Sequence, residues 1–211
     1  AGACGGMARG RLMRDIGADA PGLGLLRLRR SAGDGGGGLL QSAIEMAIGN
    51  VPGGVAQLSG GQSSVSAIRH QRLYSSESVC IMRKDHPLAH GPFTLNRFCA
   101  ARHMLVSFSG RPYGFIDESL ASLGRERHVV LTVNQFFTAG RVVANSNLLT
   151  VLPRHFVGVT GIADQLVLRP LPFDVSPVHV DAVWHRRSQQ RSAHSWLRQA
   201  LVRAADKAFA V

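Results

Sequence analysis

The chain has 211 residues, of which 45% are hydrophobic, so it can bury the core of one two-lobed domain or of two small ones. No apolar run approaches the ~20 residues of a membrane span, and the glycine-rich start lacks the hydrophobic region of a secretory signal, so we expect a soluble, cytoplasmic protein. The formal net charge is +11, but the arginines are scattered, and a composition rich in Arg, Ala and Gly explains this charge better than a DNA-binding face does.

The first part of the chain carries weak signals. Residues 12–20 are compatible with a short helix that Pro21 and Gly22 stop, and residues 23–29 with a strand. Residues 33–38 formally satisfy the G-x-G-x-x-G pattern of dinucleotide-binding loops, but no acidic residue follows about 20 positions later to bind a ribose. We interpret this glycine tract as an accidental match.

Stronger patterns follow. Residues 44–49 predict a strand that a glycine stops, and residues 51–67 are rich in Gly, Ser and Gln and predict a long loop. Residues 69–74 and 79–83 again have the composition of strands. The turn at His86-Pro87 then leads to a short helix near 95–100.

Strand and helix signals alternate without a break from residue 103 to residue 156. Residues 104–106 predict a strand, which the turn residues that follow it end. A helix is predicted next, with Gly124 as its C-terminal cap. One face of this helix consists of Phe115, Ile116, Ser119, Leu120 and Leu123.

The next unit begins with residues 129–133, whose β-branched, apolar composition predicts a strand covered on both faces. Asn134 is the expected N-cap of a second helix, and Asn147 is expected to end that helix with a left-handed turn. A third strand over 148–152 is closed by Pro153. The expected buried face of the second helix consists of Phe137, Ala139, Val142 and Val143. Alternating units of this length predict parallel strands with right-handed crossovers.

The chain closes with strands predicted at 166–171 and 178–184, followed by the clearest helix of the sequence. Ser192 is the expected N-cap of this helix. Its apolar stripe consists of Trp196, Leu197, Ala200, Leu201, Ala204, Ala205, Ala208 and Phe209, and we interpret it as core.

Catalytic and metal-binding patterns are weak. No serine has the G-x-S-x-G flanks of a hydrolase, and Pro87 between His86 and His90 favours a turn over a zinc-binding helix. His185 and His194 flank a pair of arginines at a helix entrance, where hydrogen bonding is the commoner role. The three cysteines form no Cys-x-x-Cys pair and cannot all be bridged, which is typical of a reducing compartment. We therefore expect no enzyme, no metal and no cofactor.

A series of short motifs occurs in a familiar order. They are Ile44-Glu45-Met46-Ala47-Ile48-Gly49, Arg83-Lys84-Asp85-His86-Pro87-Leu88-Ala89, His103-Met104-Leu105-Val106-Ser107, Gly114-Phe115-Ile116-Asp117 with Leu120-Ala121, Leu148-Leu149-Thr150-Val151-Leu152-Pro153, Trp184-His185 and Trp196-Leu197-Arg198. In this order they resemble the C-terminal effector-binding domain of LysR-type transcriptional regulators. The resemblance covers about residues 12–209 and is strongest from residue 73 onward.

The resemblance implies an α/β protein with the type 2 periplasmic-binding-protein fold, in which each of two lobes is a mixed, mostly parallel sheet flanked by helices. Residues 1–85 are expected to form the N-terminal part of the first lobe, although residues 1–11 do not match the family's first strand. Residues 86–174 are expected to form the second lobe, and residues 175–211 to return to the first lobe with the C-terminal helix.

The resemblance also implies a function. The chain would sense a small organic acid, of which an aromatic acid is one form. It would self-associate as a dimer or tetramer. DNA would be bound only through a helix-turn-helix domain, which this sequence does not contain. A periplasmic-type solute-binding protein is the alternative with the same fold, and an α/β enzyme is disfavoured because an acid/base set is missing.

Candidate effector-binding residues lie where the predicted parallel strands end, because ligands bind outside the carboxyl ends of such strands and near helix N-termini. By resemblance, the loop after the strand at 104–106 faces the effector. The start of the helix that follows the strand at 129–133 lies across from this loop. The expected contacts are Ser107, Ser109, Gly110, Tyr113, Asn134, Gln135, Phe136 and Pro153.

Overall fold

The computed structural model describes residues 46–50, 67–107 and 112–209. The features expected at 12–20, 23–29 and 33–38, and all but the last residue of the 51–67 loop, lie outside these ranges. The chain divides into two units. We call Ser76–Val178 the β3 unit, and the described residues before Ser76 together with those from His179 onward the α7 unit. The second lobe was expected to begin at residue 86, whereas the β3 unit also includes the strand before that residue.

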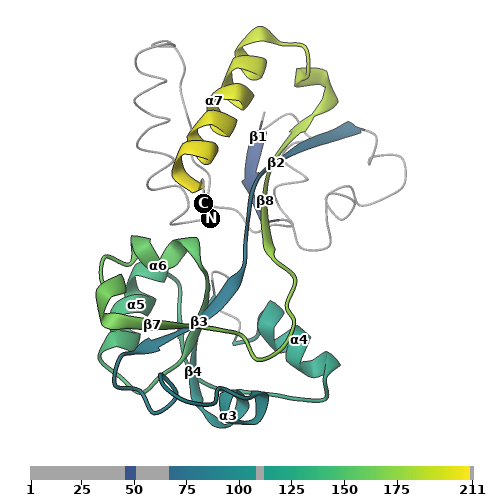
Figure 1. Ribbon diagram of the computed structural model, residues 1–211. Helices are drawn as coiled ribbons and strands as arrows, with labels where there is room; N and C mark the ends of the chain where they lie inside the picture. Colours follow the sequence, from purple (N-terminus) through teal and green to yellow (C-terminus); the bar gives the residue numbers. More distant parts are fainter. Residues whose placement is uncertain (1–45, 51–66, 108–111, 210–211) are drawn as a thin grey trace. The chain divides into compact units, whose positions relative to one another are not determined.

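The α7 unit is built on three strands in the order β1-β8-β2. These are β1 (Met46–Gly49), β2 (Ile68–Ser76) and β8 (Val178–His185), and β1 runs antiparallel to β8 with Met46 opposite Trp184. A short 3-10 turn, η4 (Arg186–Ser188), follows β8 and leads to the long helix α7 (Ser192–Phe209), which Figure 1 shows in yellow.

The apolar stripe predicted for α7 is largely confirmed. Ala200, Leu201, Ala204 and Ala205 are buried, whereas Trp196 is only partly buried. Two polar residues, His194 and Arg198, complete the buried face one turn apart. The helix begins at Ser192, which is therefore its first residue and not the residue before it.

The β3 unit is organised around β3 (Ser78–Arg83), which lies between β6 (Thr150–Pro153) and β7 (Leu166–Pro170) and pairs antiparallel with both. The expected parallel pairing is found between β4 (Arg102–Val106) and β5 (His128–Val133). A parallel bridge from His103 to Leu149 joins β4 to the residue just before β6. The pairing is mixed, as expected, with parallel pairing at β4 and antiparallel pairing at β3. It is not mostly parallel among the described strands, because both ladders of β3 are antiparallel.

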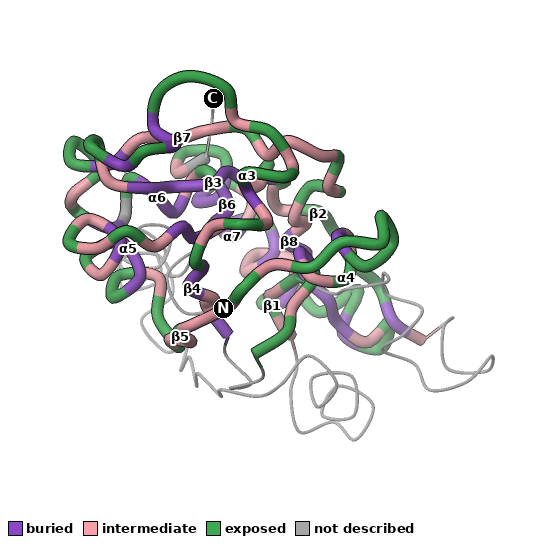
Figure 2. Tube along the Cα trace, turned by 90° about the horizontal axis from the view of Figure 1, so that it is seen from below, coloured by how far each residue is buried: buried purple, intermediate pink, exposed green. Residues whose placement is uncertain are grey.

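Helices cover both faces of β3, as expected for alternating α/β units. Val79 and Ile81 pack with residues of α5 (Phe136–Ala144), whereas Cys80 and Met82 pack with residues of α3 (Leu95–Ala100) and α4 (Phe115–Ser122). All four β3 side chains are at most 1% exposed, and Figure 2 shows this strand as a buried stretch. Alternate side chains of a strand point to opposite faces, so β3 joins the two cores.

The shorter elements complete this unit. They are α6 (His155–Val159) and the 3-10 turn η3 (Ala163–Gln165). None of the described helices is long and apolar enough to cross a membrane.

Several local predictions were wrong by one turn or less. Gln135, and not Asn134, occupies the N-cap position of α5, and its side chain makes no capping bond. Phe137 was expected to be buried but is 47% exposed, because the helix turns Ala139, Gly140 and Val143 inward. The helix ends at Ala144, so Asn147 does not cap it; the Asn147 side chain instead accepts hydrogen bonds from Arg83.

Helix α4 follows its prediction more closely. Gly124 has a φ of +65°, which confirms the predicted left-handed turn after this helix. Ile116 and Leu120 form its buried face, whereas Phe115 and Leu123 at its two ends are exposed.

Candidate functional site

The carboxyl ends of β4 and β5 lie side by side. Val106 is opposite Val133 in the ladder, and the backbone N–H of Ser107 donates to the carbonyl of Val133 at 2.8 Å. The residues that follow the two strands therefore start from neighbouring backbone positions. This places buried Ser107 next to the segment that enters α5, as the parallel-strand argument predicted.

The N-terminus of α5 lies at the surface of the described residues. Asn134 and Gln135 are exposed, and the side chain of Gln135, the N-cap residue, makes no capping hydrogen bond. The backbone N–H groups of its first turn, including those of Phe137 and Thr138, have no intrahelical carbonyl to which they can donate. The positive end of the helix dipole adds to these donors, so this terminus suits an anionic group.

The N-terminus of α4 is different, because a carboxylate of the chain already occupies it. Asp117 accepts a hydrogen bond from the Gly114 N–H at 2.8 Å. The same carboxylate accepts two hydrogen bonds from Arg127, at 2.7 and 3.0 Å. The N-terminus of α4 is therefore occupied, which leaves that of α5 as the candidate for an external anion.

Tyr113 is 54% exposed and precedes the fixed start of α4. A methyl group placed on the neighbouring Gly114 would lie 3.6 Å from Cδ1 of Leu105, so the chain returns here to the side of β4. Ser109 and Gly110, which complete the predicted loop, lie outside the described residues.

Pro153 is buried at the end of β6 and leads directly into α6. Phe156 of α6 stacks on Phe136, with ring centroids 4.2 Å apart and an angle of 18° between the planes. One face of Phe136 is therefore already covered by protein. The stacking also connects the Pro153 corner with the start of α5.

His155 belongs to the same aromatic group, with its ring centroid 4.2 Å from that of Phe156. Burial lowers the pKa of His155 to about 4, so its imidazole is neutral at pH 7. His155 and Phe156 were not among the predicted site residues. Their signal was their position, because they directly follow Pro153 at the end of a predicted strand.

No group of three or more His, Cys, Asp or Glu residues that could hold a metal ion occurs within the described ranges. The chemistry of the site therefore lies in backbone N–H donors, hydroxyl and amide side chains, and aromatic rings. Groups of these kinds can donate hydrogen bonds to a small anion and pack against an aromatic ring.

Comparisons with known proteins agree on one family. The family model described as LysR substrate binding domain matches residues 55–206. The HTH-type transcriptional activator NahR of Pseudomonas putida is 30% identical over 129 residues, which are 61% of this chain and 43% of that protein. The HTH-type transcriptional activator NagR of Ralstonia sp is 26% identical over 191 residues, which are 90% of this chain and 60% of that protein.

Solved structures give the same result. The crystal structure of the regulatory domain of MexT, a transcriptional activator in Pseudomonas aeruginosa, superposes with a TM-score of 0.73 at 25% identity, covering 94% of this chain and 91% of that domain. The chain spans about half the length of the curated relatives it matches, with 43% of one and 60% of the other.

Proposed function

The chain belongs to the family of LysR substrate-binding domains and has their type 2 periplasmic-binding-protein fold, and from this premise we propose that it senses a small organic acid for a transcriptional regulator. The observation that carries the proposal is the exposed N-terminus of α5 beside Ser107, at the joined ends of β4 and β5. A carboxylate bound there would accept the N–H groups of the first turn.

An aromatic acid is the favoured form of this ligand. Phe136, Phe156 and His155 gather at the start of α5 and α6, and Tyr113 is exposed near the end of β4. A flat ring packs well against such side chains. Because Asp117 already occupies the N-terminus of α4, the ligand's carboxylate would point to α5 and the ring would lie toward the aromatic group.

The other parts of the function follow from the family. Its members that match this chain are transcriptional regulators, which supports a non-enzymatic role and disfavours the solute-binding alternative. In the whole protein, DNA recognition would belong to a helix-turn-helix domain and would take place in the cytoplasm. The chain would transmit ligand binding to that domain.

Self-association is also proposed. Within the described residues β5 pairs only with β4, so its other edge has no neighbouring strand. Leu131 of this edge strand is 38% exposed. An edge strand with an exposed apolar side chain suits pairing with a second copy of the chain, as a dimer or as part of a tetramer.

Calorimetric titration of the chain with benzoate and with cyclohexanecarboxylate tests the ligand class, because the two acids differ in the flat ring. We expect benzoate to bind more tightly. The Gln135→Ala and Tyr113→Ala variants should each lose affinity, by tenfold or more where a hydrogen bond to the charged ligand worth about 1.5–3 kcal/mol disappears. Gln165→Ala removes another exposed glutamine, from η3, and should bind like the parent.

Two results would contradict the proposal. If neither acid binds, the chain does not sense a carboxylate of this class. If benzoate binds the parent and both site variants equally well, the ligand lies elsewhere.

A further inference from the structure

Helices α5 and α6 run in the same direction and begin at the same edge of the β3 unit. Near their starts, Phe136 stacks on Phe156 with 4.2 Å between the ring centroids. One turn further along, a Cβ added to Gly140 of α5 would lie 2.7 Å from the Cβ of Thr160, the C-cap residue of α6. The two contacts are four residues apart in both segments, so the N-termini of the two helices point the same way.

This edge is the place where the order of the parallel strands reverses. Helix α4 leads from β4 to β5 on one side of β4, whereas α5 leads from β5 to β6 on its other side. The β4–β5 ladder continues to the pair Val106 and Val133, but the bridge from His103 to Leu149 is the only pairing of β4 on its β6 side among the described residues. Ligands of open α/β sheets bind outside the carboxyl ends of the strands at such a switch point.

Arg154 brings a positive charge to this edge. It directly follows Pro153, the last residue of β6, and it is the N-cap residue of α6. Its backbone N–H donates to the carbonyl of Glu77 at 2.8 Å, and the residue is exposed. Gln135 holds the corresponding N-cap position of α5. The arginine therefore stands beside the helix end to which the proposed function assigns the ligand's carboxylate.

The guanidinium of Arg154 has no carboxylate partner in the part of the chain that the structure describes. Glu77 is joined to it through the backbone, but the side chain of Glu77 is exposed and forms no ion pair with Arg154 there. The ion pairs of the described residues are Arg72–Asp181, Arg83–Asp85 and Arg127–Asp117. An exposed arginine without such a pair is accessible to an anion from solution.

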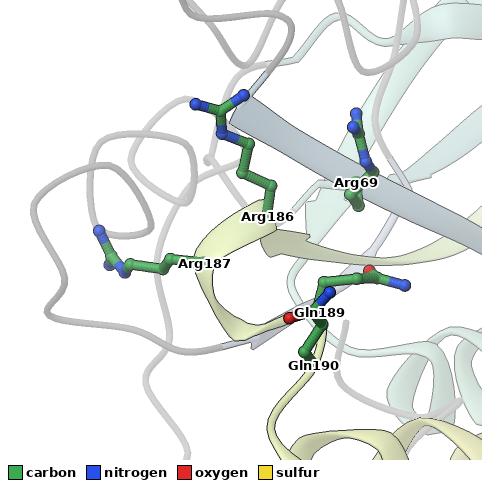
Figure 3. Close-up of a pocket in the computed structure, with 5 residues that line it drawn as sticks. All are labelled: Arg69, Arg186, Arg187, Gln189 and Gln190. Carbon is green, nitrogen blue, oxygen red and sulfur yellow. The ribbon is translucent and has the colours of Figure 1, made fainter.

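Arginines also meet in the α7 unit, but their situation differs. A hollow of about 400 Å³ in that unit, shown in Figure 3, is lined by Arg69, Arg186, Arg187, Gln189 and Gln190. Arg69 and Arg187 already interact with other residues of the chain. Arg154 belongs to the β3 unit, which also carries the candidate effector site.

We propose that Arg154 binds the carboxylate of the effector and makes the site selective for charged acids, an inference that rests on the function proposed above. A guanidinium presents two parallel N–H donors that match the two oxygens of a carboxylate. The N–H groups at the start of α5 would contact the same carboxylate. A helix end carries the equivalent of about half an elementary charge, whereas Arg154 carries a full one. Arg154 should therefore contribute most of the preference for an anion over a neutral analogue.

Calorimetric titration with benzoate and with benzamide tests this role, because the two molecules share the ring and differ in charge. Arg154→Gln should weaken benzoate binding at least tenfold, which corresponds to about 1.4 kcal/mol. The same variant should change benzamide binding less than about twofold, since benzamide makes no ion pair. A residue that only supported the structure of the site would affect both molecules alike.

Arg102→Gln is the matched control. It removes the same charge from an exposed position at the start of β4, whereas the candidate site lies at the end of that strand. Five residues of a strand span roughly 16 Å, about twice the Debye length at 0.15 M salt. The control should therefore change benzoate binding less than about twofold. Arg154→Lys keeps the charge without the planar fork and should restore part of the benzoate affinity that Arg154→Gln loses.

The outcomes separate this inference from the function on which it rests. If the parent binds neither molecule, the proposed function fails and the role of Arg154 fails with it. If the parent binds benzoate and Arg154→Gln binds it equally well, only the role of Arg154 is refuted.

Three further results would also refute this role. Equal losses of benzoate affinity in Arg154→Gln and Arg102→Gln would assign the preference to the net charge of the chain. Equal losses for benzoate and benzamide in Arg154→Gln would assign the residue a structural role. An Arg154→Lys variant that binds benzoate no better than Arg154→Gln would exclude an ion pair.

Discussion

Arg127 and Asp117 form a two-point ion pair inside the β3 unit, with Nε donating to Oδ1 at 2.7 Å and the second guanidinium nitrogen to Oδ2 at 3.0 Å. The side chains of Arg127 and Asp117 are 1% and 10% exposed. A buried pair of this kind becomes costly when one partner is removed, because the other charge stays buried and unpaired. The pair also fixes the start of α4 through the bond from Gly114 to Asp117.

We therefore expect Asp117→Ala to lower the free energy of unfolding by about 3–5 kcal/mol, measured by urea denaturation. Asp85→Ala is the matched control: its partner Arg83 lies 3.6 Å away, and the Asp85 side chain is 90% exposed. An exposed pair contributes little, so the control should change the unfolding free energy by less than about 1 kcal/mol. Equal losses in the two variants would show that the buried Asp117–Arg127 pair contributes no more to stability than the exposed Asp85–Arg83 pair does.

Gly140 is required by close packing between α5 and α6. A Cβ added there would lie 2.7 Å from Cβ and 2.8 Å from Cγ2 of Thr160. Gly140→Ala should therefore destabilise the protein by about 1–3 kcal/mol, despite the higher helix propensity of alanine. Gly158 in α6 has open space around it, so Gly158→Ala should be neutral or stabilising. Thermal unfolding of both variants distinguishes these effects. If Gly140→Ala is as stable as the parent, α5 and α6 can move apart there without a cost in stability.

His103 is expected to make stability depend on pH. Burial lowers its pKa from 6.5 to about 4, although the hydrogen bond from Nε2 to the Phe98 carbonyl at 2.7 Å opposes this. Its Nδ1 is buried and has no partner within the described ranges, so a proton there would be unmatched. Below pH 6.5 the unfolded chain takes up this proton before the folded chain does, so stability is complete above 6.5 and falls as the pH approaches 4.

Between pH 7 and pH 5 this one group should reduce the unfolding free energy by about 2 kcal/mol. His103→Gln lacks the titrating group. Between pH 7 and pH 5 its unfolding free energy should therefore fall by about 2 kcal/mol less than that of the parent. His90→Gln, at an exposed position, serves as the control and should keep the slope of the parent. Identical slopes in all three proteins would assign the pH dependence to other groups.

Leu131 offers a test of self-association. Leu131→Lys places a charge on β5, one edge of which has no neighbouring strand among the described residues, and this charge opposes strand pairing between two copies. Sedimentation should show association weakened about tenfold or more if this edge lies at the centre of the interface. Leu123→Lys, at a 51% exposed position after α4, adds the same charge as a control. A parent that remains monomeric at tens of micromolar would contradict the association itself.

The sequence predicted those elements whose signals are local. The alternation of β4, α4, β5 and α5 was found from apolar runs and turn residues, and the parallel β4–β5 pair followed from connection length. The adjacent ends of these strands, and hence the neighbourhood of Ser107 and α5, were predicted in the same way. The ligand contacts assigned to these residues remain predictions.

Features that depend on distant partners were missed. Two consecutive phenylalanines gave no means of deciding which one faces inward; Phe136 does so because Phe156 of α6 stacks on it. The antiparallel ladders of β3 depend on β6 and β7, which come much later in the chain. Arginines that look scattered in sequence meet in space, since Arg69 and Arg186 lie more than a hundred positions apart and line one hollow.

The division of the chain into units has a consequence for synthesis. The β3 unit is one uninterrupted stretch, Ser76–Val178, whereas the α7 unit needs chain from both sides of it. Strand β1 pairs with β8, so Met46 must wait for Trp184 before it has its partner. Domains generally fold as they leave the ribosome. The β3 unit can therefore be completed while β1 and β2, which emerge earlier, are still without β8. Among the described strands, these two are made before the others and wait longest for β8.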